Sequence, residues 1–110
     1  MLSEMKQLVR EKNICVLATV TGSKPYCSLM AYAANADGTE IYMATRRSSR
    51  KFRNLSENPA VSLLIDTREE DIDHRRQDIR ALTVSGVFQH IDDPSEQDRN
   101  LRQLLERHPH

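Results

Sequence analysis

Five apolar runs of strand length, separated by turn-forming residues, constrain the fold of this chain most strongly. The run at 14–20, ICVLATV, is nearly unbroken and β-branched, which is typical of a strand buried on both faces. Between two of the runs, NADG at 35–38 is a strong hairpin signal. Gly86 predicts a bulge or bend in the last run. The five predicted strands are residues 14–20, 26–34, 39–45, 60–67 and 79–91.

Three short helices are predicted around these strands, starting near residues 3, 48 and 94. Asp93 as N-cap, followed by Pro94 and by Glu96 at the third position, marks the last start. Strict alternation of strand and helix is missing, which disfavours a parallel sheet. The order predicts an α+β fold, a small antiparallel β-barrel with short flanking helices. The length of 110 residues predicts a single domain over residues 1–110.

Charge and composition exclude several functional classes. The 16 acidic and 16 basic residues cancel, so no global field attracts nucleic acid or an acidic membrane. Cys15 and Cys27 lie in apolar runs without CxxC spacing, and we expect both to be buried free thiols in a reducing compartment. No run is long enough to cross a membrane. We therefore expect a cytoplasmic protein that has neither a nucleic acid nor a membrane as partner.

A cluster of five cations at the start of the second predicted helix stands out against this balance. The cations fall within eight residues and are Arg46, Arg47, Arg50, Lys51 and Arg53. A helix N-terminus already carries partial positive charge, so basic side chains are mildly unfavourable there. Either the cluster is a solvated face that pairs with the charged loop predicted at 68–78, or an anion binds among the cations.

An anion at this position would be held by side chains and by the free N–H groups of the helix start. No glycine lies between Gly38 and Gly86, which excludes a Walker A loop or a GxGxxG motif there. The hydroxyl groups of Thr45, Ser48 and Ser49 flank the cations, and this combination suits a phosphate monoester. A nucleic-acid-binding module is a further alternative, although the one aromatic residue among the cations, Phe52, is three residues from Leu55 and is expected in the core.

The order of these segments resembles the FMN-binding split-barrel family related to pyridoxamine 5'-phosphate oxidase. A strand CVLATV, a turn with Gly and Pro, a strand YCSLMAY and a DG hairpin follow one another as in that family. The most specific part is IYMATRRSSRKFRNLSENPAVSLLI, and RALTVSGVFQHIDDP matches the family's strand with a central glycine. The resemblance covers most of the chain and implies a small split β-barrel.

The resemblance also implies an FMN site and an assembly. In that family a Ser-Arg-Lys run holds the phosphate, a threonine lies along the phosphate or ribityl chain, and the ring-facing strand covers the isoalloxazine. The positions implied to bind FMN are Ser28, Leu29, Met30, Thr45, Ser49, Arg50 and Lys51. Members are typically homodimers with FMN at the subunit interface, so a homodimer with two sites is implied.

The chain departs from true pyridoxamine 5'-phosphate oxidases at three places. Their ring-facing strand carries an Arg and a Lys, whereas CSLMAY has no charge. Their later strand opens with Arg-Gln, whereas Arg80 is followed by Ala81, and their C-terminal basic segment is missing. We therefore do not expect the vitamin oxidase activity. Small relatives continue into another strand beyond the position of His110, which implies a chain truncated at its C-terminus or a barrel completed by the partner subunit.

No catalytic residue can be identified from the sequence. The histidines at 74, 90, 108 and 110 are scattered, one in the charged loop, one at a strand end and two at the terminus, so no metal site is expected. This is compatible with an enzyme, because a flavin carries the redox chemistry itself. The sequence therefore predicts a small FMN-dependent oxidoreductase of unknown substrate that transfers a hydride or electrons through flavin N5. The alternative is a non-catalytic protein that binds or stores flavin, deazaflavin or haem.

Overall fold

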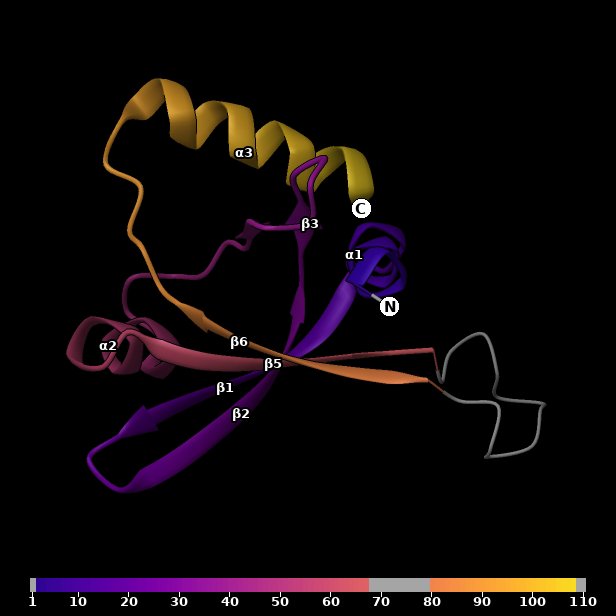
Figure 1. Cartoon of the computed structure of the whole chain (residues 1–110). Coiled ribbons are helices and arrows are strands. Elements are labelled where there is room, and N and C mark those ends of the chain that lie inside the picture. Colours follow the sequence, from indigo (N-terminus) through magenta and orange to yellow (C-terminus); the bar gives the residue numbers. More distant parts are fainter. Residues whose placement is uncertain (1, 68–79, 109–110) are drawn as a thin grey trace.

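The computed structural model describes residues 2–67 and 80–108 (Figure 1). The charged loop predicted at 68–78, including His74, lies outside the described residues, as does His110. The elements in chain order are α1 (Leu2–Glu11), β1 (Ile14–Thr21), β2 (Lys24–Ala31), β3 (Ala33–Ala34), β4 (Ile41–Tyr42), α2 (Arg50–Glu57), β5 (Ala60–Asp66), β6 (Ala81–Val87) and α3 (Pro94–Arg107). No helix among them is long and apolar enough to span a membrane.

The larger sheet has four antiparallel strands in the order β2-β1-β5-β6, and a smaller sheet pairs β3 with β4. The hairpin of β1 and β2 is paired along its whole length, from Ile14 opposite Ala31 to Thr21 opposite Lys24. In Figure 1 the strands cross near the centre of the molecule, with α2 at one end of the sheet and α3 beyond the smaller sheet. Helices and antiparallel sheets together confirm the α+β class.

The core lies on one face of the four-stranded sheet. In β1, Cys15, Leu17 and Thr19 are buried, and the residues between them are only half-buried. Within a single chain, only one face of β1 is buried, so the prediction that both faces are buried is wrong. The sequence does not distinguish the two faces, because residues 16, 18 and 20 on the half-buried face are apolar like most of the buried residues between them.

The second predicted strand and its hairpin partner are shorter than expected. Residues 26–34 divide into β2 and the two-residue β3, and only Ile41 and Tyr42 of the 39–45 run pair as β4. The NADG hairpin itself is confirmed. The Asn35 carboxamide oxygen accepts from the backbone N–H groups of Thr39 and Glu40, and Gly38 has a φ of 69° that favours glycine.

Two further expectations fail in the later strands. Gly86 pairs regularly with Val61, and the register of β5 and β6 runs unbroken from Ala60 opposite Val87 to Asp66 opposite Ala81, so the predicted bulge is absent. The last strand also ends at Val87, before the predicted boundary at 91.

The two cysteines differ in environment, which corrects the expectation that both are buried. Cys15 is buried in the core, whereas Cys27 is exposed on the opposite face of the sheet because strand residues alternate in direction. Burial raises the pKa of the Cys15 thiol to about 11 from its ordinary value of 9.0.

Thiol titration should therefore separate the two cysteines. We expect an aromatic disulfide reagent at pH 8 to react with one thiol per chain in the folded protein and with both after unfolding, because the reactive thiolate of Cys15 is disfavoured by burial. Because folding favours the neutral thiol of Cys15, the stability that this residue contributes is fully present below pH 9 and is lost as the pH rises through about 11. Rapid reaction of two thiols in the folded chain would contradict the placement of Cys15.

Candidate functional site

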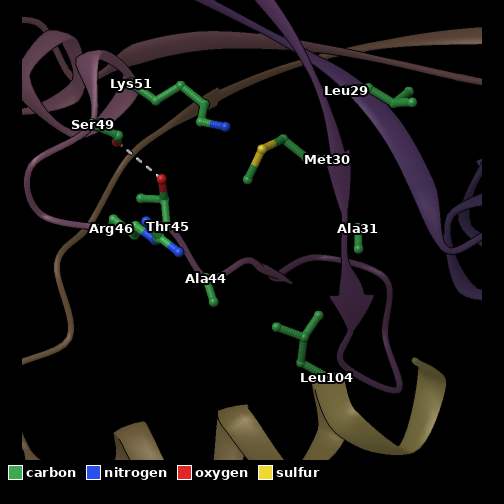
Figure 2. Close-up of a pocket in the computed structure, with 9 residues that line it drawn as sticks. All are labelled: Leu29, Met30, Ala31, Ala44, Thr45, Arg46, Ser49, Lys51 and Leu104. Atoms are coloured by element: carbon green, nitrogen blue, oxygen red, sulfur yellow. Dashed lines mark hydrogen bonds between the residues drawn. The ribbon is translucent and has the colours of Figure 1, made fainter. Parts of the chain in front are cut away.

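A pocket of about 400 Å³ lies where the end of β2, the segment after β4, the start of α2 and the helix α3 meet (Figure 2). This volume falls within the range of ordinary small-molecule sites, roughly 300 to 1,000 Å³. The lining residues are Leu29, Met30, Ala31, Ala44, Thr45, Arg46, Ser49, Lys51 and Leu104. Polar and cationic members come from the 45–51 segment, and apolar members come mainly from β2 and α3.

The polar end is organised by the start of α2. Ser49 is the N-cap of this helix, and its hydroxyl accepts from the backbone N–H of Phe52 at 3.1 Å. The hydroxyl groups of Thr45 and Ser49 lie 3.1 Å apart and are hydrogen-bonded to each other (Figure 2). The first turn of α2 contains no acidic side chain, so the partial positive charge of the helix start is not neutralised there.

Two cations line the same end of the pocket. Arg46 precedes the helix and Lys51 lies in its first turn; in Figure 2 Arg46 lies next to Thr45, and the Lys51 side chain extends on the other side of the Thr45–Ser49 pair with its nitrogen towards Met30. Neither cation takes part in a salt bridge among residues 2–67 and 80–108. Hydroxyl groups between two free cations form an arrangement that can bind an anion with charge-assisted hydrogen bonds.

The other end of the pocket is apolar. The side chain of Met30 is buried and points from β2 into the pocket, towards the side of Lys51 (Figure 2). Ala31 and Ala44 leave space beside it, and Leu104 of α3 closes the far side. The pocket therefore has a cationic end and an apolar end, which suits an amphipathic anion.

Five of the seven residues expected to bind FMN line this one pocket: Leu29, Met30, Thr45, Ser49 and Lys51. Ser28 and Arg50 do not. The guanidinium carbon of Arg50 lies 5.6 Å from the centre of the Tyr26 ring, on another side of the helix start from Lys51. The buried hydroxyl oxygen of Ser28 has no hydrogen-bond partner within the part of the chain that the structure describes.

Sequence reasoning missed four of the residues that line the pocket, which are Ala31, Ala44, Arg46 and Leu104. Arg46 belonged to the noted cation cluster, but its role could not be separated from that of its neighbours. Leu104 belongs to an apolar helix stripe whose residues Leu101 and Leu105 are exposed, so the stripe alone did not identify the member that reaches the pocket. Ala31 and Ala44 carried no chemical signal.

The cationic helix start is held in place by a buried polar cluster on its other side. Asn54 of α2 is only 4% exposed. Its amide nitrogen donates to the Thr19 hydroxyl at 3.2 Å, and its amide oxygen accepts from the Thr21 hydroxyl. These contacts join α2 to β1 and so fix the orientation of Lys51 relative to the sheet.

Metal-binding groups are not evident in this site. Residues 2–67 and 80–108 contain no cluster of three or more His, Cys, Asp or Glu side chains able to hold a metal. His90 forms an exposed pair with Asp92 at 2.8 Å, next to the rings of Phe52 and Phe88. His108 lies 3.0 Å from the carbonyl oxygen of Tyr32.

Solved structures share this fold. A conserved hypothetical protein from Mycobacterium tuberculosis is 28% identical, with a TM-score of 0.83 over 98% of this chain; the chain spans 64% of the length of that protein. HutZ, the haem storage protein of Vibrio cholerae, is 25% identical over 96% of this chain and 74% of its own, with a TM-score of 0.77. The match confirms the split β-barrel.

A more distant structure, an FAD-binding protein from Mesorhizobium loti, supports the fold alone. It is 18% identical, with a TM-score of 0.78 over 98% of this chain and 75% of its own. A search of curated proteins found no match. The family model described as pyridoxamine 5'-phosphate oxidase matches residues 1–109, nearly the whole chain. The chain therefore belongs to the pyridoxamine 5'-phosphate oxidase family.

Proposed function

We propose that this chain binds FMN in the pocket between β2, α2 and α3 and that it serves as a small FMN-dependent oxidoreductase of the cytoplasm. The observation that carries the proposal is the division of one pocket into a cationic, hydroxyl-bearing end and an apolar end. FMN has the same division, because a phosphate dianion is joined by a ribityl chain to a flat ring. We do not propose that the chain binds nucleic acid, because Arg46 and Lys51 line a pocket and so do not share one open surface with the other cations of the cluster.

The phosphate would lie at the polar end. Arg46 and Lys51 supply the charge, and Thr45 and Ser49 supply hydroxyl groups. The Ser49 hydroxyl already accepts from the Phe52 N–H, so its own proton is free to be donated to a phosphate oxygen in place of Thr45. Arg50 would add charge at longer range or reach the site by leaving the Tyr26 ring.

The isoalloxazine would lie at the apolar end. Met30 and the backbone of β2 offer a flat, dry surface for the ring, with Leu29 at the open edge and Ser28 behind it. The unpartnered Ser28 hydroxyl gains a partner if the ring or a bound water reaches it. The flavin, when bound, supplies hydride or single-electron transfer, and the residues of this chain bind and orient it.

A comparison of FMN with riboflavin tests this proposal. Riboflavin has the same ring but lacks the phosphate, so only FMN can use the cationic end. We expect FMN to bind about 100-fold more tightly than riboflavin, since two charge-assisted hydrogen bonds are lost with the phosphate. Quenching of flavin fluorescence measures both dissociation constants. Equal affinities would show that the cations do not hold a phosphate.

Haem is a second candidate ligand, favoured by one observation. Met30 is buried and points into the pocket, and a methionine sulfur can serve as an axial haem ligand. No histidine, cysteine or tyrosine lines the pocket among the residues that the structure describes. The residues that line the pocket therefore suit FMN better than haem. A non-catalytic carrier of flavin or deazaflavin would use the same contacts as an FMN-dependent enzyme.

We also propose that the chain forms a homodimer through the outer face of its larger sheet. Leu29, Val16 and Leu64 are direct cross-strand neighbours on this face, opposite the core. Leu29 is 68% exposed and Leu64 is 37% exposed, so the row is an open apolar surface. Leu29 also lines the pocket, so a second copy seated on this row would cover the open edge of the FMN site.

Leu64→Glu should therefore separate the subunits. A charge that must be desolvated in the interface is expected to raise the dimer dissociation constant by about 100-fold, and FMN affinity should fall with it. Analytical ultracentrifugation measures the first effect and fluorescence titration the second. Leu105→Glu, which adds the same charge on α3, is the matched control and should leave the dimer intact. A wild-type chain that is monomeric at micromolar concentration would contradict the proposal.

A further inference from the structure

The helix α3 supplies the wall of the pocket that lies opposite the cations. Leu104 is the residue of α3 that lines the pocket, and Figure 2 places it at the far side from Lys51 and Ser49. Leu104 is half-buried, whereas Leu101 and Leu105 on the same helix are exposed. The distance between α3 and α2 therefore sets the length of the ligand that fits.

The position of this wall is fixed by the last residues of α3. Arg107 donates from one guanidinium nitrogen to three carbonyl groups at the C-terminal end of α1, those of Arg10, Glu11 and, just beyond the helix, Lys12, at 3.2, 2.9 and 3.2 Å. The C-terminal end of a helix carries partial negative charge, so a cation is favourable there. His108 adds a contact of 3.0 Å to the Tyr32 carbonyl oxygen. Leu104 lies one turn before both contacts.

We propose that α3 is the specificity element of the site: Leu104 contacts the ring end of the ligand, and Arg107 positions Leu104. This inference rests on the FMN proposal and deepens it. The selected class is a phosphate ester of a planar, multi-ring group. A phosphate ester with a single small ring leaves the α3 wall untouched.

Paired titrations with FMN and phenyl phosphate test the inference. Phenyl phosphate shares the anionic end of FMN but has a single ring in place of the ribityl chain and the three-ring isoalloxazine. We expect Leu104→Trp to weaken FMN about tenfold by overfilling the ring end, with the affinity for phenyl phosphate unchanged. Leu104→Ala should weaken FMN about threefold or more, again without effect on phenyl phosphate. Leu101→Trp, on the exposed side, is the control and should change neither.

The positioning role of Arg107 is tested by the ratio of the two affinities. Arg107→Ala should lower the preference for FMN over phenyl phosphate about fivefold, and Arg107→Lys should restore part of it. Arg102→Ala is the matched control, because Arg102 lies on the same helix in an exposed pair with Asp98 at 3.0 Å. Loss of stability alone would not change this ratio at temperatures where each variant is folded.

The outcomes separate the two proposals. If the wild-type chain binds FMN but Leu104→Trp binds it equally well, the α3 inference is overturned and the FMN site stands. Equal weakening of FMN and phenyl phosphate by Leu104→Trp overturns the inference as well, because it indicates general damage to the pocket. If the wild-type chain binds phenyl phosphate but not FMN, both the proposed function and the inference fail.

Discussion

Replacing Arg46 and Lys51 together by alanine should lower the affinity for FMN by about 100-fold or more. Each removes a hydrogen bond from a cation to the phosphate, worth roughly 1.5 to 3 kcal/mol, and every 1.4 kcal/mol corresponds to about a factor of ten. Neither side chain has a salt-bridge partner within the described part of the chain, so the double substitution leaves no acidic side chain unpaired there. Fluorescence titration with FMN at moderate salt measures the effect.

Two comparisons make this prediction specific to the pocket. Arg47→Ala together with Arg53→Ala removes the same formal charge from the same cluster, but neither residue lines the pocket. That control should weaken FMN less than about threefold, as expected for exposed charges screened by solvent. Arg50→Ala alone should have an intermediate effect, because its guanidinium lies over Tyr26. If both double variants weakened FMN equally, the cluster would act as a general field and not as a site.

Asn54→Ala should produce the largest loss of stability among single changes near the site. Asn54 is buried and its amide bonds two threonine hydroxyls of β1, so its removal leaves Thr19 and Thr21 without these partners and opens a cavity. A buried polar group left unsatisfied costs roughly 1 to 3 kcal/mol. We expect a loss of about 2 to 4 kcal/mol in the free energy of unfolding. Urea denaturation monitored by circular dichroism measures it.

The matched control for Asn54 lies on the same helix. Ser56→Ala removes an exposed hydroxyl that bonds the Phe52 carbonyl and should cost less than about 0.5 kcal/mol. Combining Asn54→Leu with Thr19→Val replaces both partners by apolar groups of similar size and should recover part of the stability lost in Asn54→Ala. FMN affinity should fall in Asn54→Ala even where the protein is folded, because α2 is no longer anchored to β1. Unchanged affinity would show that Asn54 stabilises the fold without orienting Lys51.

Local chemistry predicted the elements whose signals lie within a few residues. The Asn35 to Gly38 turn and the N-cap Asp93 before Pro94 appear where they were expected, and the cation-rich helix predicted to start near residue 48 begins at Arg50. Each depends on backbone geometry that one side chain can satisfy, such as a positive φ or a free N–H group.

Tertiary relationships could not be predicted in the same way. Arg50 and Lys51 are neighbours in sequence, yet successive helical residues point about 100° apart, so only one faces the pocket. Which one does depends on how α2 is rotated on β1, and the Asn54 contacts that fix this rotation join residues 35 apart in sequence. Leu104 could not be predicted for the same reason, because its place in the pocket depends on contacts between distant parts of the chain, from Arg107 to α1 and from His108 to Tyr32.

The absorption spectrum of the purified protein, followed by titration with FMN, tests the central claim most directly. We predict a flavin spectrum or, for protein purified without ligand, saturable quenching of flavin fluorescence at about one FMN per chain. Faster oxidation of a reduced nicotinamide than free FMN achieves would add the oxidoreductase activity. A Soret band would instead assign haem to the pocket. A colourless protein that leaves FMN fluorescence unchanged would contradict the account and return the cations to the solvated surface.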